Sequence, residues 1–241
     1  MKVKLIGVPG SHPARAAELM LRHKGIEYTR FDLPNMSHKY ILPLMRYRAS
    51  TVPVMKIDGR RVTTTRRIAR ALDALAPEPP LFPPTDRATV EGAEAWADAT
   101  LQDGVRQLGR WAAPRDPEAM ASFLEGARMG VPIGLVKASL PALRPVLAMQ
   151  MRVPDETARA CAEALPGQLD RVDALLAEGV IGGPQRNAAD FQIATSVRLA
   201  MCFDQFRDAI AARPAGGHAM RVCPDYPGRF GAVLPADWVA L

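Results

Sequence analysis

The sequence predicts an α/β domain with the element order βαβαββα, followed by a domain built only of helices. Short β-prone runs alternate with helical patterns over residues 1–76, whereas residues 87–241 show helical periodicity and no convincing strand alternation. Residues 77–86 separate the two patterns. Five of the eight positions from 77 to 84 are proline, which excludes a helix there and predicts a short, stiff linker between the domains.

The first strand and the first helix are predicted on either side of a Pro-Gly turn. Residues 3–8 alternate as a strand does, and Ser11 is a candidate N-cap for the helix that follows. Pro13 suits a first helical turn, and Gly25 is placed to end the helix. Residues 26–32 then predict the second strand.

The rest of this domain is organised around residues 51–68. They contain two β-prone runs joined by Asp58-Gly59, a pair that tolerates the positive φ angles of a tight hairpin turn. Pro53 stands at the start of the first run, where a missing N–H is tolerated. The threonines at 63–65 supply capping hydroxyls for a third helix, and the earlier stretch 36–48 is weakly helical.

Five helices are predicted after the linker, from their apolar spacing. They span residues 85–111, 117–129, 135–151, 155–178 and 188–211. The segment 216–241 is rich in glycine and proline, and we expect it to lie irregularly over the surface of the helical domain.

Composition and charge exclude several classes of protein. With 48% hydrophobic and 23% charged residues, the chain is typical of a globular protein. Its net charge of +6 is uneven, because residues 1–78 hold 15 Lys and Arg against 6 Asp and Glu. No aromatic residues interleave with the arginines of residues 60–70 to stack on bases, so nucleic acid is not the expected partner. The pattern favours a solvated basic face, or a field that attracts a small anion.

The cysteines and the apolar segments indicate a cytoplasmic protein. Cys161, Cys202 and Cys223 are widely spaced and odd in number, so neither a disulfide framework nor a metal site is indicated. The first nine residues contain no apolar run of signal-peptide length. Residues 129–149 are apolar on average, but two basic residues and three prolines argue against a membrane span.

Four motifs occur in the order and at the spacing found in glutathione S-transferases. They are Ser11-His12-Pro13 at a helix start, Val52-Pro53 before the hairpin, the linker with a long helix bearing Glu94, Trp96 and Asp98, and Asn187-Ala-Ala-Asp190 after Gly182-Gly183. The chain therefore resembles this family, and its serine-type members in particular. The resemblance implies a thioredoxin-like first domain, a helical second domain and glutathione as co-substrate.

The resemblance also implies the site residues. The Ser11 hydroxyl is expected to donate a hydrogen bond to the glutathione sulfur, whose ionised form the positive end of the first helix favours. Val52-Pro53 matches the family's cis-proline turn, and the backbone of Val52 is expected to pair with the cysteinyl part of glutathione. Thr64 and Thr65 stand where the family receives the γ-glutamyl group, with backbone N–H groups for its carboxylate.

Two positions depart from the family pattern. Thr64 replaces the usual acidic or amide residue, so no side chain is offered to the γ-glutamyl amine, and Thr51 replaces a frequent basic residue. For the electrophile site between the domains, Gln102, Arg106 and Trp111 are candidates, with packing or solvent exposure as the alternative. His12 is expected to be an exposed residue rather than a base.

The sequence thus supports an enzyme that transfers the glutathione sulfur to a small hydrophobic electrophile, or carries out a related thiol-dependent reaction. A homodimer is expected, because the helix after the linker combines apolar residues with alternating charge and the family is mostly dimeric. The alternative is a transferase-like binding or scaffold protein with weak or no catalysis. Thr64 favours this alternative, whereas Ser11, Val52-Pro53 and Thr65 favour the enzyme.

Overall fold

The computed structural model describes residues 1–239. Its first domain has the order βαβαββα, as predicted. The elements are β1 (Val3–Gly7), α1 (His12–His23), β2 (Thr29–Asp32), α2 (His38–Leu44), β3 (Val54–Ile57), β4 (Arg60–Thr63) and α3 (Thr65–Leu75). The four strands form one sheet in the order β2-β1-β3-β4, in which β1 runs parallel to β2 and antiparallel to β3.

The hairpin between β3 and β4 forms where the sequence predicts it. Asp58 and Gly59 both have positive φ angles, of 44° and 94°, and β3 pairs with β4 from Val54 opposite Thr63 to Ile57 opposite Arg60. The Val52–Pro53 peptide bond is cis, which confirms that expectation, and the Glu78–Pro79 bond in the linker is cis as well.

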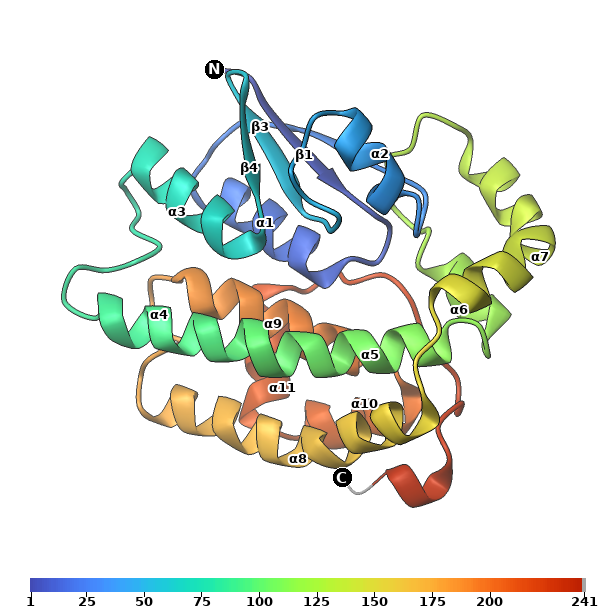
Figure 1. The fold of residues 1–241 in the computed structure, drawn as a ribbon. Helices are drawn as coiled ribbons and strands as arrows, with labels where there is room; N and C mark the ends of the chain where they lie inside the picture. The colour runs from blue at the N-terminus through green and yellow to red at the C-terminus, as the bar shows by residue number, and fades with distance from the viewer. Residues whose placement is uncertain (240–241) are drawn as a thin grey trace.

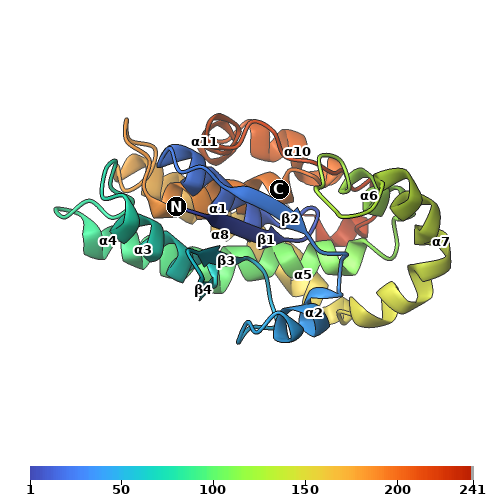
Figure 2. The ribbon, with the colours of Figure 1, turned by 90° about the horizontal axis from the view of Figure 1, so that it is seen from above.

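The two faces of the sheet are covered by different helices, because alternate side chains of a strand point to opposite faces. Val3 and Leu5 of β1 belong to the main core, which includes α1, α3 and the helical domain. Ile6 points the other way, into a small cluster with Leu42 of α2. In Figures 1 and 2, α1 and α3 accordingly lie between the sheet and the helical domain, while α2 lies apart from them.

The second domain is helical. Its elements are α4 (Arg87–Trp96), the π-helical segment η1 (Ala97–Leu101), α5 (Gln102–Ala112), α6 (Pro117–Ser122), α7 (Ile133–Gln150), α8 (Asp155–Ala177), α9 (Ala188–Ala200), α10 (Asp204–Ala211), α11 (Pro214–Val222) and the short 3₁₀ helix η2 (Ala236–Trp238). The first three follow one another without a break and form the long helix that crosses the middle of Figure 1.

Helix α9 is the centre of this domain and packs on α1, α4, α5 and α11. Every residue of α9 except Arg198 is buried. Its start is the predicted capping box: the Asn187 side chain accepts from the N–H groups of Ala189 and Asp190, and the Asp190 carboxylate accepts from the Asn187 N–H. A helix end buried this deeply requires such partners, because water cannot reach its free N–H groups.

The predicted helix over residues 188–211 is wrong in one respect, since it is divided at residues 201–203 into α9 and α10. Phe230, from the carboxyl-terminal segment, causes the division. Its N–H donates to the Cys202 carbonyl at 2.7 Å, and its carbonyl accepts from the Asp204 N–H at 3.0 Å. These bonds occupy backbone groups that a continuous helix would use internally.

Two further expectations differ from the structure. The helix predicted over residues 117–129 ends at Ser122, and the chain then returns to β2, where Asp32 and Arg128 exchange two hydrogen bonds of 2.8 Å. The segment expected to lie irregularly over the surface begins inside α11, and its residues 223–235 are irregular as expected, but Phe230, Leu234 and Trp238 are buried. Residues 240–241 lie outside the part of the chain that the structure describes.

Helix α7 stands out from the rest of the domain (Figure 1). Only Leu147 among its residues is buried, and Leu135, Leu143, Val146 and Met149 are exposed. Within residues 1–239, neither α7 nor any other helix has the length and apolar character needed to cross a membrane.

A buried carboxylate fixes α1 against β2. Glu18 is 1% exposed, and its two oxygens accept hydrogen bonds from Arg15, Arg22, Tyr28 and Arg30 at 2.8–3.0 Å. Burial alone raises the pKa of a carboxyl group. Here the charge of Arg30 and the hydrogen bonds from Tyr28 and Arg15 outweigh burial and lower the pKa of Glu18 from 4.5 to about 2.

This ion cluster predicts a pH-dependent effect of Glu18→Gln. The pKa of Glu18 is lower in the folded protein than in the unfolded chain. The ionised carboxylate therefore stabilises the folded protein fully above pH 4.5, and this stabilisation is lost as the pH falls through about 2. We expect the variant to be less stable than the wild type by about 3 kcal/mol at pH 7, since it leaves the part-buried guanidinium of Arg15 without a carboxylate and removes one of the two carboxylates paired with Arg30. The difference should shrink at pH 3, as measured by urea unfolding.

The control is Glu178→Gln, which removes a carboxylate from a half-exposed pair with Arg171. We expect it to change stability by less than about 1 kcal/mol at either pH. An equal deficit of Glu18→Gln at pH 7 and pH 3 would contradict an ionised Glu18.

Candidate functional site

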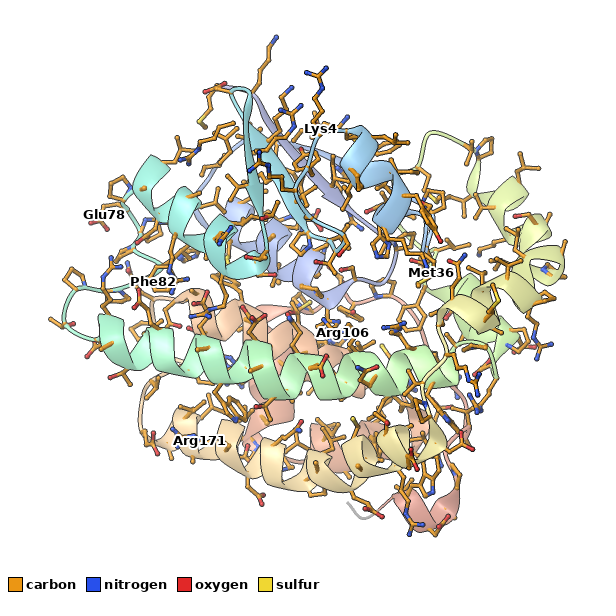
Figure 3. All side chains as sticks on the ribbon, viewed as in Figure 1. Lys4, Met36, Glu78, Phe82, Arg106 and Arg171 are labelled. Atoms are coloured by element: carbon orange, nitrogen blue, oxygen red, sulfur yellow. The ribbon has the colours of Figure 1, made fainter. Side chains whose placement is uncertain are left out.

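A cavity of about 330 Å³ lies between the first domain and the helical domain. The first domain contributes its β1–α1 loop, the start of α2 and the residues before β3, namely Val8–Pro13, Asn35, Met36, His38, Thr51 and Val52. The helical domain contributes Arg106, Gly109, Arg110, Ala113, Met120, Phe123, Met151, Leu199 and Phe230. Figure 3 labels one residue from each side, Met36 and Arg106, at the boundary between the domains.

Ser11 lies at the junction of the β1–α1 loop and α1, on the wall of this cavity. It is the N-cap of α1, with its hydroxyl accepting a hydrogen bond from the Ala14 N–H at 3.3 Å. This bond uses the oxygen as an acceptor only. The hydroxyl proton remains free to donate, so capping and donation to a ligand are compatible.

Val52 lines the same cavity. Among the backbone bonds formed within residues 1–239, the Val52 N–H and carbonyl have no partner, although β3 begins only two residues later, at Val54. Unpaired strand groups of this kind can pair with an extended peptide.

Pro53, Thr64 and Thr65 adjoin the cavity without lining it. The Thr64 N–H donates to the Pro53 carbonyl at 3.3 Å, which places the start of α3 beside the Val52-Pro53 turn. Thr64 is the N-cap of α3, and its hydroxyl accepts from the Arg67 N–H at 3.4 Å. Thr65 is buried at the first helical position.

Thr64 has an unusual backbone conformation, with φ 67° and ψ 145°. A β-branched residue with positive φ is a genuine outlier, since its side chain crowds the backbone. Such strain costs of the order of 1–3 kcal/mol and is concentrated at functional sites. The start of α3 therefore belongs to the candidate site on geometric grounds as well.

His12 is buried, contrary to the expectation of an exposed residue. It is 3% exposed, it lines the cavity, and its Nε2 atom has no hydrogen-bond partner within the described chain. Burial and the nearby charge of Arg106 lower the pKa of His12 to about 3, and an interaction with the Gln102 backbone opposes this only in part. His12 is thus neutral at neutral pH and far too weak a base to take a proton from a thiol.

Helix α5 forms the opposite wall. Arg106 and Arg110 are four residues apart and therefore share one face of the helix. Of the three residues considered for an electrophile site, Arg106 lines the cavity, whereas Gln102 and Trp111 do not. Trp111 points to the other side, where its Nε1 donates to Asp155 at 2.7 Å.

The floor of the cavity is aromatic and depends on two glycines. A Cβ atom on Gly10 would lie 2.6 Å from the Phe123 ring, and one on Gly228 would lie 2.2 Å from it. Both glycines also have positive φ angles, of 71° and 96°. Phe123 packs in turn on Phe230, with 5.0 Å between ring centroids. Only glycine lets these two backbones approach the ring so closely.

Comparisons with known proteins identify the first domain. Residues 5–80 match the family model for the glutathione S-transferase N-terminal domain. This part of the chain is a glutathione S-transferase N-terminal domain. No sequence among the curated proteins matches the chain significantly.

Solved structures extend the likeness to the whole transferase fold. The beta-etherase LigF from Sphingobium is 18% identical, with a TM-score of 0.60 over 92% of this chain and 99% of that chain. A glutathione transferase homologue from Sulfitobacter, solved with bound glutathione, is 17% identical, with a TM-score of 0.54 over 91% of each chain. FzlA from C. crescentus is 18% identical, with a TM-score of 0.53 over 99% of this chain and 98% of that chain. At these identities the likeness concerns the fold alone.

The cysteines of this transferase fold lie outside the cavity, and their environment disfavours the thiolate. Burial raises the pKa of Cys202 to about 12 and also raises the pKa values of Cys161 and Cys223. All three are free thiols. A reactive cysteine has a lowered pKa, so a thiol acting in this cavity has to come from a ligand.

The glycine contacts predict that Gly228→Ala is more damaging than Gly59→Ala. The two glycines have nearly equal φ angles, 96° and 94°, but a Cβ on Gly59 would meet nothing within 4 Å. We expect Gly59→Ala to cost about 1 kcal/mol for its backbone and Gly228→Ala about 2 kcal/mol more for overpacking against Phe123. Urea unfolding measures both values.

A double variant separates the clash from the backbone cost. In a Phe123→Ala background the ring is absent, so adding Gly228→Ala should cost no more than Gly59→Ala does. If the cost of Gly228→Ala is the same with and without the ring, the contact with Phe123 is not what requires glycine.

Proposed function

We propose that the chain is a glutathione-dependent transferase, in which residues 1–76 bind glutathione and the cavity shared with the helical domain, residues 87–241, receives a small hydrophobic electrophile. The observation that carries this proposal is that Ser11 and Val52 line one cavity, opposite an apolar and basic wall from the helical domain. A thiol bound at Ser11 is thereby brought to the place where a second substrate binds.

Glutathione is held mainly by backbone groups in this proposal. The free N–H and carbonyl of Val52, next to Pro53, pair with its cysteinyl part, as an added strand does. The γ-glutamyl carboxylate is received at the start of α3 by the N–H group of Thr65, at the positive end of the helix dipole, because the Thr64 N–H is already bonded to the Pro53 carbonyl. The strained backbone of Thr64 supports this assignment.

The reaction is a substitution by sulfur. The bound thiol loses its proton to solvent, assisted by the hydrogen bond from the Ser11 hydroxyl and by the positive end of α1, which both favour the thiolate. The thiolate then forms a bond to an electrophilic carbon, and the leaving group departs with its electron pair. His12 supplies shape and polarity but no base, because its pKa is held at about 3.

The alternative is a transferase-like binding or scaffold protein without catalysis. Thr64 favours it, because its hydroxyl already caps Arg67 and offers no carboxylate to the γ-glutamyl amine. In either case we propose a cytoplasmic homodimer, on the strength of the family resemblance.

Two measurements separate these proposals. Calorimetric titration with glutathione tests binding, and an assay with an activated aryl halide tests conjugation. Binding with turnover supports the transferase, and binding without turnover on any of a panel of aryl halides, epoxides and enones supports the alternative. Absence of both overturns the glutathione assignment.

The role of Ser11 predicts the effect of Ser11→Ala. Loss of one hydrogen bond to a charged sulfur is worth about 1.5–3 kcal/mol, so kcat/KM should fall about ten- to hundredfold at fixed pH. The pKa of the bound thiol, read from the pH dependence of the rate, should rise.

Ser11 also caps α1, so the variant needs a control for stability. Ser11→Ala should cost about 1 kcal/mol of stability, whereas Ser11→Gly should cost only a few tenths, since glycine is tolerated at an N-cap. Both variants lack the hydroxyl and should lose activity equally. If Ser11→Gly instead keeps most of the activity, as it keeps most of the stability, then Ser11 serves only as a helix cap.

The departure at Thr64 predicts that Thr64→Glu tightens glutathione binding. Thr64 is exposed, so the added charge can reach the γ-glutamyl amine, and a surface ion pair contributes up to about 1 kcal/mol. A several-fold fall in the dissociation constant is expected in calorimetry, with little change in melting temperature. The control, Thr85→Glu, adds the same charge in the exposed linker and should not affect binding. If Thr64→Glu binds glutathione no more tightly than the wild type does, the γ-glutamyl amine does not lie beside residue 64.

A further inference from the structure

The helical wall of the cavity carries positive charge and no negative charge. The charged and titratable residues that line it are His12, His38, Arg106 and Arg110, and no aspartate or glutamate is among them. His12 and His38 are both shifted toward the neutral form, by burial and by neighbouring cations. The charge on the wall is therefore that of the two arginines.

Arg106 is the weaker candidate for holding a ligand. Its guanidinium donates to the carboxylate of Asp103, one turn earlier on α5, and its side chain is 44% exposed. Part of its charge is therefore neutralised and the rest is screened by solvent. Figure 3 shows Arg106 on the side of α5 that faces the first domain.

Arg110 is different, because it has no carboxylate partner within residues 1–239. One of its terminal nitrogens donates to the Gln150 carbonyl at 3.2 Å, and its Nε atom is buried without a hydrogen-bond partner. Burial and the charge of Arg106 lower the pKa of Arg110, with Asp103 opposing them. A buried N–H donor that lacks a partner is costly, and a charged one more so. An anionic group in the cavity gives the guanidinium of Arg110 the charged partner that residues 1–239 do not supply.

The surroundings of Arg110 are apolar. Met120, Phe123, Met151 and Phe230 line the cavity with it, and Gly109 beside it adds no side chain that narrows the space. A ligand that fits this wall has an apolar body and one anionic group. Planar carboxylates match the guanidinium fork best, through two parallel N–H donors.

We propose that the electrophilic substrate is a carboxylate-bearing apolar compound, such as an aryl carboxylate, whose carboxylate binds Arg110. This rests on the proposed function and names the substrate class of the same site. The ring lies against Phe123 and Phe230, and the reactive carbon faces the thiolate at Ser11. Arg106 adds to the positive field and remains paired with Asp103.

Glutathione itself carries carboxylates, and the experiment must distinguish it from the second substrate. The probes are 3,5-dinitrobenzoate and the neutral 3,5-dinitrobenzamide, which have the same ring and no leaving group, so their binding is measured by calorimetry without any reaction. Wild type should bind the benzoate about ten- to hundredfold more tightly than the benzamide, because only the benzoate carboxylate can form a charge-assisted hydrogen bond with Arg110.

Arg110→Met keeps an unbranched apolar stem of similar bulk and removes the guanidinium group with its charge. It should abolish the preference by weakening the benzoate about ten- to hundredfold, with little effect on the benzamide or on glutathione. Arg110→Lys should restore part of the preference, because it keeps the charge without the fork. The control is Arg171→Met, which removes the same charge from α8, well away from the cavity in Figure 3, and should change neither probe.

Steady-state kinetics with reactive substrates provide a second measurement of the same preference. With 4-chloro-3,5-dinitrobenzoate and the matching benzamide, the thiolate displaces chloride, and each enzymatic rate is divided by the rate with free glutathione at the same pH. Arg110→Met should raise KM for the benzoate and leave the benzamide unchanged.

The outcomes are distinct. Equal binding of benzoate and benzamide by wild type overturns the proposal, and so does an equal loss of both in Arg110→Met. A loss of glutathione affinity in Arg110→Met with no change in the probes assigns Arg110 to glutathione and overturns it too. A preference for benzoate that depends on Arg110, in a protein that neither binds nor conjugates glutathione, upholds the anion site and refutes the transferase.

Discussion

The packing of the Phe123 ring against the backbones of Gly10 and Gly228 is the contact on which the candidate site depends. It joins three segments that are distant in sequence: the β1–α1 loop, the end of α6 and the carboxyl-terminal segment. Hydrogen bonds reinforce it, since Tyr226 donates to the Gly10 carbonyl at 2.7 Å and Arg15 donates to the Asp225 carbonyl at 2.8 Å. The position of Ser11 is thereby set by residues more than two hundred positions later in the chain.

The first domain was predictable because its signals are local. Strand alternation, the Asp58-Gly59 turn and the threonine cap each act within a few residues, and the structure places all three as predicted. The capping box at Asn187 is local in the same way. Where the sequence misled, contacts with distant parts of the chain replace the predicted helix: Phe230 bonds to the backbone where the helix over 188–211 is divided, and Arg128, in the part of 117–129 that is not helical, bonds to Asp32.

The same distinction between local signals and distant contacts applies to the residues of the candidate site. Ser11 and Val52 carry motifs and were found from the sequence, whereas His12 was misjudged because its burial is provided by α5 of the other domain. No feature of the sequence indicates that Arg110 belongs to the site. In sequence, a charged residue on an amphipathic helix resembles a solvated one, and only the folded structure shows that the Arg110 Nε is buried without a hydrogen-bond partner in residues 1–239.

Part of the basic character of the first domain is explained by ion pairing, whereas Arg60, Arg61 and Arg67 are exposed as a solvated basic face requires. Arg66 and Arg70 of α3, which suggest a solvated basic face, both donate to Glu94 of α4, which is fully buried. Burial raises the pKa of Glu94 despite the hydrogen bonds and charges of Arg70 and Arg66, so this contact between the domains is held at a cost in desolvation. In the helical domain, by contrast, Arg110 has no carboxylate partner within residues 1–239, and it lines the cavity.

The strained conformation at Thr64 bears on the choice between an enzyme and a binding protein. A chain that had lost its ligand would be free to replace a β-branched residue at φ 67° and ψ 145°, a region that glycine adopts without cost. Instead the conformation is fixed on both sides, by the Thr64 N–H bond to Pro53 and by the cap on Arg67. These contacts hold a backbone arrangement that presents the start of α3 to an anion, while the Thr64 side chain carries no acidic group. This combination favours a glutathione site that still holds the carboxylate and binds the amine weakly, rather than a site that has been abandoned.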